Sequence, residues 1–187
     1  MIAAIIIVVL LVLVVGWLFA QYNRLIKLRN LVTEAWAQID VELTRRHDLT
    51  PNLIATVKGY AAHEATTLQD VTNARAAAVA VNSAAPAARV GAEDTLTNSL
   101  GRLIAISENY PDLKADSAFL NLQHQLTDTE DRIAASRRLY NGNVRALNTA
   151  LETVPTNMIA NTIGGFTKED YFEATDATVR DVPTVSF

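Results

Sequence analysis

Three histidines, His47, His63 and His124, are the residues of this 187-residue chain best suited to bind a metal or to transfer protons. A carboxylate-bridged di-iron site in a helical bundle requires a Glu three positions before each of two histidines, with further Glu residues on the other helices. The residues at those positions are instead Thr44, Tyr60 and Asn121. We therefore expect no metal site, and histidines that are solvated or hydrogen bonded.

Other signatures of catalysis are also missing from the sequence. His63-Glu64 could begin a zincin motif, but Thr67 stands where that motif has its second histidine. The chain has no cysteine, which excludes thiol nucleophiles and cysteine-based zinc sites. No Ser, Thr or Lys lies in a catalytic signature, and no glycine-rich loop could cradle a phosphate. The sequence predicts a protein that is not an enzyme and that needs no cofactor.

A run of charged residues, Arg45-Arg46-His47-Asp48, is a candidate partner-binding site. We predict that a helix ends here, so the run would form a corner at the far end of the soluble domain. The alternative, which we favour, is that these cations serve the dipole of their own helix, because a helix C-terminus carries partial negative charge.

Polar residues also interrupt the apolar stripes of two predicted helices, Glu64 and Arg75 in one and Glu130 and Arg137 in the other. They could form a buried charged layer that fixes helix register, or line a polar cavity open to a ligand. Buried charges need partners, so replacing Glu130 by Leu should destabilise the protein if it pairs with a buried Arg. We favour the alternative that the four lie at the edges of the stripes with their charged ends in water.

The segment from Met1 to Ala20 has no charged or polar side chain. Such a run is long enough to cross a bilayer as a helix, which needs about 20 apolar residues. A cleaved signal peptide is disfavoured, because no basic residue precedes the run and bulky residues stand where a cleavage site needs small ones. We predict a retained single-pass anchor over residues 1–21, with lipid-facing side chains that include Ile5, Val9, Val12, Trp17 and Phe19.

Three basic residues, Arg24, Lys27 and Arg29, follow the apolar run before the first acid, Glu34. Because basic residues are retained on the cytoplasmic side, this asymmetry predicts an external N-terminus and a cytoplasmic domain at the cell membrane. The net charge of the whole chain is −4, and its basic residues are scattered. We therefore expect the bilayer, and not nucleic acid, to be a partner.

Apolar residues at spacings of three and four predict an all-α domain over residues 22–155. The expected helices cover about 22–47, 50–82, 87–109 and 112–154, with Thr50-Pro51 as N-cap and first residue of the second helix. Short connections then favour an antiparallel up-and-down four-helix bundle that continues from the anchor. The fourth helix contains half of a coiled-coil seam, a heptad repeat of Phe119, Leu126, Ile133, Tyr140, Leu147 and Val154.

The region 156–187 is predicted to lie outside the bundle. Pro155 ends the preceding helix, and Ile163-Gly164-Gly165-Phe166 is expected to form a loop. Thr167 and Asp170 resemble a capping box, which predicts a short helix at Tyr171-Phe172. The tail 174–187 is expected to be extended or loosely docked.

Three stretches of the chain, Tyr22–Glu64, Glu108–Val144 and Gly165–Ala174, resemble the LemA family. The first reads YNRLIKLRNLVTEAWAQIDVELTRRHDLTPNLIATVKGYAAHE, and the last reads GFTKEDYFEA. The resemblance implies a four-helix bundle on an N-terminal transmembrane helix in a bacterial inner membrane, and a more distant similarity to magnetosome membrane proteins. The family has no assigned catalytic residues. Where family members have an apolar residue in a LIPNL-like motif, this chain has Thr50.

These observations lead to two hypotheses of different kinds. The first is a non-enzymatic, membrane-anchored helical bundle that acts as a scaffold or recruits other membrane proteins, with self-association favoured by confinement in two dimensions. The second follows only from the resemblance, since family members are often encoded near membrane proteases of the HtpX type. In that case the protein would be a cofactor or regulator of such a protease in envelope stress.

Overall fold

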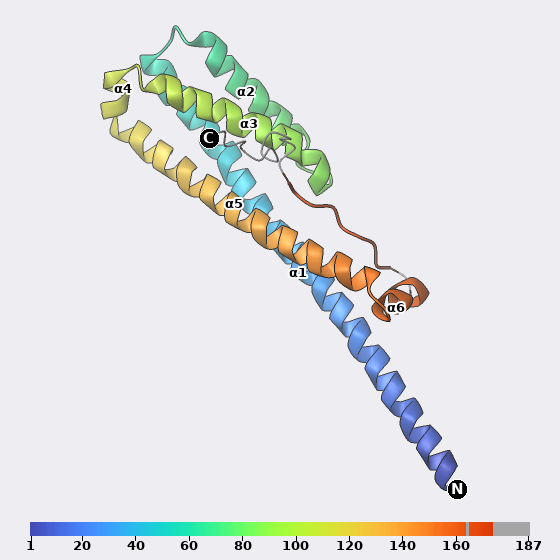
Figure 1. Ribbon diagram of the computed structural model, residues 1–187. Coiled ribbons are helices and arrows are strands. Elements are labelled where there is room, and N and C mark those ends of the chain that lie inside the picture. The colour runs from blue at the N-terminus through green and yellow to red at the C-terminus, as the bar shows by residue number, and fades with distance from the viewer. Residues whose placement is uncertain (164, 174–187) are drawn as a thin grey trace, which may run out of the picture. The chain divides into compact units, whose positions relative to one another are not determined.

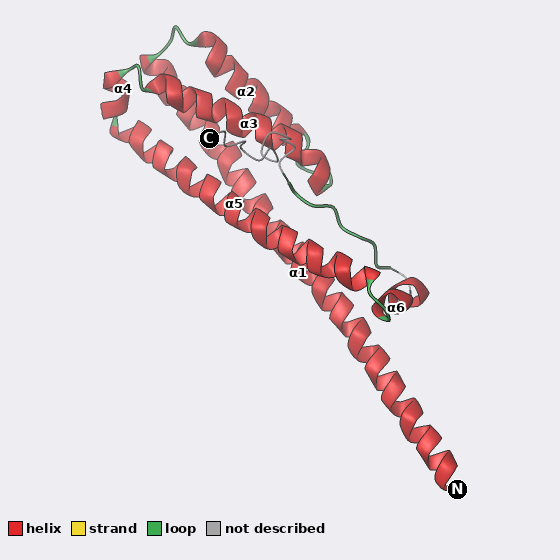
Figure 2. Ribbon diagram, in the orientation of Figure 1, coloured by secondary structure: helices red, strands yellow, loops and turns green. Residues whose placement is uncertain are grey.

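The computed structural model describes residues 1–163 and 165–173 (Figure 1). In these residues every regular element is a helix, which confirms the prediction of an all-α chain with a long apolar N-terminal helix (Figure 2). The predicted extended tail, 174–187, lies outside the described residues. The helices are α1 (Ile2–Tyr60), α2 (Ala65–Ala80), α3 (Pro86–Ser107), α4 (Pro111–Ala115), α5 (Ser117–Glu152) and α6 (Thr156–Ile163).

The chain forms two compact units, and both α1 and α5 contribute to each. The first unit contains residues 1–38 and 136–171. The described part of the second contains residues 39–135 and 172–173.

In the first unit, the apolar side chains after the anchor region pack as the helical spacing predicts. Leu25, Val32 and Ala35 of α1 are buried, as are Val144 and Leu147 of α5. The amide of Asn143 donates a 3.0 Å hydrogen bond to the carbonyl of Leu31, and the rings of Trp36 and Tyr140 lie 5.5 Å apart. Trp36 therefore packs on α5.

The segment after α6 is not helical, so the predicted short helix at Tyr171-Phe172 is wrong. Gly165 begins the segment with a φ of +85°, a value that favours glycine. Asn148 of α5 then pairs with Glu169, donating to its carbonyl at 2.9 Å and accepting from its N–H at 3.0 Å. The Tyr140 hydroxyl donates to the carbonyl of Asp170. Asn148 and Tyr140 thus bond to backbone groups of residues 169–170 that would otherwise form the hydrogen bonds of a helix. The helix of this region lies earlier, at α6.

The second unit has one apolar core to which α1, α2, α3, α4 and α5 all contribute. Its fully buried members include Leu53, Val71, Leu96, Leu113 and Phe119. Asp116 separates α4 from α5, where we predicted one helix, and caps α5 by accepting the N–H of Phe119 at 2.9 Å.

The predicted break between two helices at residues 47–50 is wrong, because α1 continues through it to Tyr60. Pro51 lies inside α1 and has no N–H, so it cannot bond to the carbonyl of His47 as a residue at i+4 normally does. Nε of Arg75 donates to that carbonyl at 2.7 Å in its place. Thr50 is buried and is not an N-cap, since its hydroxyl donates to the carbonyl of Arg46 within the same helix. Arg75 thus compensates for the proline and allows α1 to remain helical.

We predict that Arg75→Met lowers the free energy of unfolding of the second unit by about 1–3 kcal/mol, because it leaves a buried carbonyl without a donor. The cost should be much smaller in a Pro51→Ala background, where the backbone N–H of residue 51 can bond to His47 again. Denaturant titrations of the full chain in detergent, followed by circular dichroism, measure both effects. Equal costs in the two backgrounds would show that Arg75 does not act through the His47 carbonyl.

Candidate functional site

A cluster of charged side chains is buried in the second unit, where α1, α3 and α5 meet. Arg46 of α1 is only 1% exposed, and Glu93 of α3 only 3%. One guanidinium nitrogen of Arg46, Nη2, lies 2.5 Å from Oε2 of Glu93. The other, Nη1, lies 2.7 Å from Oε1 of Glu130 and donates to the hydroxyl of Thr97 at 2.6 Å. Arg46 therefore connects helices that are far apart in the sequence.

A second buried arginine, Arg89, extends the cluster toward the turn between α2 and α3. Its guanidinium lies 2.7 Å from Oδ1 of Asp40 and donates to the backbone and side-chain oxygens of Asn82, each at 3.0 Å. It also lies 3.7 Å from Oε1 of Glu93. We call Asp40, Arg46, His47, Arg89, Glu93 and Glu130 the buried charge cluster.

Glu93 is the central carboxylate of the buried charge cluster. Besides the two arginines it faces His47, whose Nε2 lies 3.2 Å from Oε2 of Glu93. Burial alone raises the pKa of the Glu93 carboxyl, but the hydrogen bond with His47 and the charge of Arg46 outweigh it. The pKa is therefore held below its ordinary value of 4.5, and the group stays ionised.

The cluster's geometry suits a structural role better than a chemical one. Oε2 of Glu93 contacts both Arg46 and His47. Arg46 in turn contacts carboxylate oxygens of α3 and α5. In residues 1–163 and 165–173, no group of three or more His, Asp or Glu residues is arranged to hold a metal ion. Burial of an arginine is tolerated only when oxygens take up its hydrogens, and Arg46 finds such oxygens on α3 and α5.

The structure divides the predicted run Arg45-Arg46-His47-Asp48 between the interior and the surface. Arg46 and His47 point inward, whereas Arg45 and Asp48 are exposed. Our favoured explanation, that the run serves the dipole of its own helix, is wrong because α1 does not end here.

The remaining predicted polar residues have separate partners. Glu130 joins Arg46, and its side chain is 35% exposed. Arg75 reaches the His47 carbonyl. Glu64 accepts a hydrogen bond from the Tyr110 hydroxyl at 3.0 Å, which raises the pKa of Tyr110. Arg137 is half-buried in the first unit.

Sequence reasoning missed Arg89 and Glu93, which the apolar spacing could have revealed. Both lie on the face of α3 that carries Val90, Leu96 and Leu100 into the core. Charged residues on a core-facing stripe that are four positions apart indicate a buried pair.

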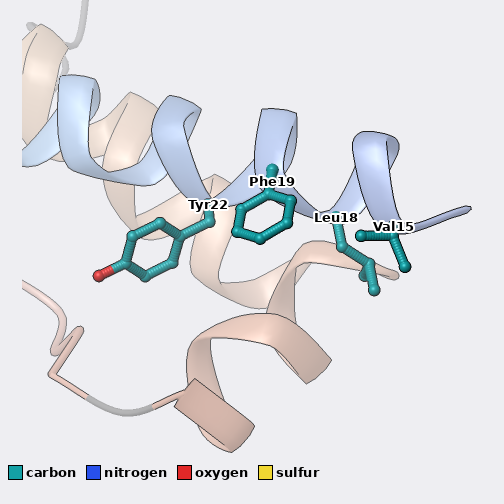
Figure 3. A pocket seen from close by; sticks show the side chains of 4 residues that line it. All are labelled: Val15, Leu18, Phe19 and Tyr22. Atoms are coloured by element: carbon teal, nitrogen blue, oxygen red, sulfur yellow. The ribbon is translucent and has the colours of Figure 1, made fainter. Parts of the chain in front are cut away.

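A different candidate site lies in the first unit, where α1 leaves its apolar run. The helix is long and apolar enough to cross a membrane, and its most apolar window is unburied. Side chains at positions i, i+3, i+4 and i+7 line an apolar groove of about 300 Å³ there, namely Val15, Leu18, Phe19 and Tyr22 (Figure 3). The Tyr22 ring packs edge-on against Phe166, and the guanidinium of Arg29 lies 5.5 Å from the centre of the Phe166 ring. Arg24 and Lys27 are exposed.

Comparison with known proteins gives a family and several relatives. The LemA family model matches residues 35–187. The magnetosome protein MamQ of Magnetospirillum gryphiswaldense is 26% identical over 193 residues, which cover 90% of this chain and 70% of the relative. A MamQ protein of Paramagnetospirillum magneticum is 25% identical over 196 residues, with 92% and 71% covered. Protein LemA of Metamycoplasma hominis is 27% identical over 155 residues, with 80% and 69% covered.

We predict that Glu93→Gln lowers the free energy of unfolding at pH 7 by about 3 kcal/mol, because it leaves buried arginines without their central carboxylate. Since the folded-state pKa of Glu93 is lowered, its contribution is complete above pH 4.5 and is lost as the pH falls through that lowered value. The difference between wild type and variant should therefore shrink below pH 4.5. Denaturant titrations between pH 3 and 7 test this, with exposed Glu108→Gln as the control. A difference that is independent of pH would contradict it.

Proposed function

The chain belongs to the LemA family, and from this premise we propose a non-enzymatic protein that is anchored in a bacterial membrane by α1 and recruits or organises other proteins there. The observation that carries the proposal is the contrast between interior and surface. In the most polar interior site, the buried charge cluster, the charged side chains form ion pairs with one another. The first residues of α1 instead present large apolar side chains outward, including Ile5, Val9, Val12, Trp17 and Phe19.

The exposed apolar run supports membrane anchoring on physical grounds. Soluble proteins rarely expose a contiguous apolar patch larger than a few hundred Å², and such a patch marks a surface that another medium or molecule covers. A helix satisfies its own backbone hydrogen bonds, so a bilayer can accept it without further partners.

For the second unit we propose the antiparallel up-and-down four-helix bundle that the sequence predicts, with shifted boundaries. The helices would be the latter part of α1 together with α2, α3 and α5. Two features support this arrangement. All four helices supply residues to one core, and short connections join α1 to α2 and α2 to α3.

We propose that partners, including further copies of this chain, contact the α1 outer face, which we define as Val41, Arg45 and Asp48. These residues follow one another at i, i+4 and i+7, so they share one side of the helix. Val41 is 65% exposed although it is apolar, and both charged neighbours are exposed. An exposed apolar residue followed along the helix by two charges of opposite sign suits a small contact with the surface of another protein.

We predict that the second unit is cytoplasmic, because Arg24, Lys27 and Arg29 follow the apolar run. In Ser83→Cys, the exposed turn between α2 and α3 carries the only thiol of the protein. A membrane-impermeant maleimide should not label intact cells expressing this variant, but should label it after lysis. Labelling of intact cells would place the unit outside and favour an envelope role.

We also predict that the double variant Arg45→Glu, Asp48→Lys reduces recovery of neighbouring proteins severalfold in proximity labelling, without lowering the melting temperature. The charge reversals lie on the surface, and exposed substitutions usually change stability by less than about 0.5 kcal/mol. Glu108→Gln is the matched surface control. Recovery of a membrane protease as the main neighbour would favour the regulator hypothesis. An unchanged set of neighbours in the double variant would show that the α1 outer face does not bind partners.

A further inference from the structure

The apolar groove on α1 is unusual because it is formed within the stretch assigned to the membrane. Val15, Leu18 and Phe19 belong to the apolar run, and Tyr22 follows it directly. All four side chains point to the same side of α1, toward the ribbon of α6 (Figure 3). The other side of the helix carries Leu13, Trp17 and Ala20, because residues two or five positions away lie roughly opposite. Both faces of the run are apolar, and the groove lies on the face with Val15, Leu18 and Phe19.

Contacts of the first unit place the polar end of the groove at the membrane boundary. Tyr22 is held by the Phe166 ring at a centroid distance of 5.7 Å. The guanidinium of Arg29 lies over the same Phe166 ring. Counted from Tyr22, Arg29 is two helical turns further along α1 on the same face, about 10 Å away at 1.5 Å per residue. A cation at this distance can reach back to the headgroup layer, which is several ångströms thick on each side of the hydrocarbon.

Two large apolar side chains at and just before α6 are also exposed. Val154 is 75% exposed and Met158 of α6 is 63% exposed, although both are large and apolar. They are four positions apart and belong to the same unit as the groove. Ile159 and Ala160 of α6 are buried, so α6 has one face against the protein and exposes Met158 on another.

We propose that the groove binds one phospholipid, with an acyl chain along Val15, Leu18 and Phe19 and the phosphate near Arg29. The inference rests on the proposed membrane anchoring. An acyl chain is the occupant because the lining residues lie in the hydrocarbon layer, where lipid chains are the surrounding medium. Arg29 supplies the positive charge that a phosphate needs, and its stacking on Phe166 holds it on the groove face. Ordinary lipid contact would be equal on both faces of α1, whereas a groove retains a chain on one.

The test uses the full chain in phosphatidylcholine vesicles that contain a phosphatidylglycerol with a photoactivatable diazirine in its acyl chain. Mass spectrometry then maps the adducts. We expect adducts at Val15, Leu18 and Phe19 to exceed those at Leu13 and Trp17 at least threefold. Val15→Trp should fill the groove and reduce labelling of Leu18 and Phe19 severalfold. Leu13→Trp, which adds the same ring to the opposite face, should leave it unchanged.

Each outcome of this experiment bears on a separate part of the inference. Equal labelling of both faces would overturn the groove site while leaving the anchor intact. Absence of adducts anywhere in residues 2–20 would overturn the anchor itself. For the headgroup, Arg29→Gln should lower total groove labelling by the anionic lipid, and Arg29→Lys should restore it. Unchanged labelling in Arg29→Gln would overturn the assignment of the phosphate.

Discussion

The arrangement of the second unit depends on the burial of Arg46. A guanidinium placed in a protein interior costs several kcal/mol unless oxygens replace its water, and removal of one partner is strongly destabilising. Here the oxygens come from Glu93 of α3 and Glu130 of α5, while Arg46 itself comes from α1. Apolar packing alone would tolerate small shifts of these helices along one another. The ion pairs add a constraint, since a displacement of one helical turn would separate Arg46 from Glu93 and Glu130.

The same requirement, that polar groups in the interior be satisfied, explains two local features of the fold. Pro51 deprives the His47 carbonyl of its helical donor, and Arg75 supplies another from α2. In the first unit, Asn148 and Tyr140 of α5 bind the backbone of residues 169–170 and hold that segment in a non-helical conformation. Burial, with the negative charges of Glu169 and Asp170, raises the pKa of Tyr140 to about 12, so its hydroxyl remains a donor throughout the physiological range.

These interior networks bear on function because they engage the residues that sequence reasoning treated as candidate sites. Glu130 and Arg46 pair with each other, and Glu64 pairs with Tyr110. The two surfaces for which we propose partners, the α1 outer face and the apolar groove beside Tyr22, are made of other residues. We propose a protein as the partner of the first and a lipid as the partner of the second. Membership of the LemA family and similarity to MamQ proteins are compatible with both.

By itself, the sequence determined the class of the fold, the apolar N-terminal helix and the family. Helical spacing and an unbroken apolar run are local patterns, and residues such as Leu25, Val32 and Ile39 occupy the core that the spacing predicts. Only the tertiary structure decided where α1 ends, which charges are buried and what pairs with them. The decisive contacts join residues far apart in sequence, as Arg75 does with His47, 28 positions away, and Glu130 with Arg46, 84 positions away. No local pattern specifies such pairs, because these contacts form, and stabilise the protein, only after the helices have packed.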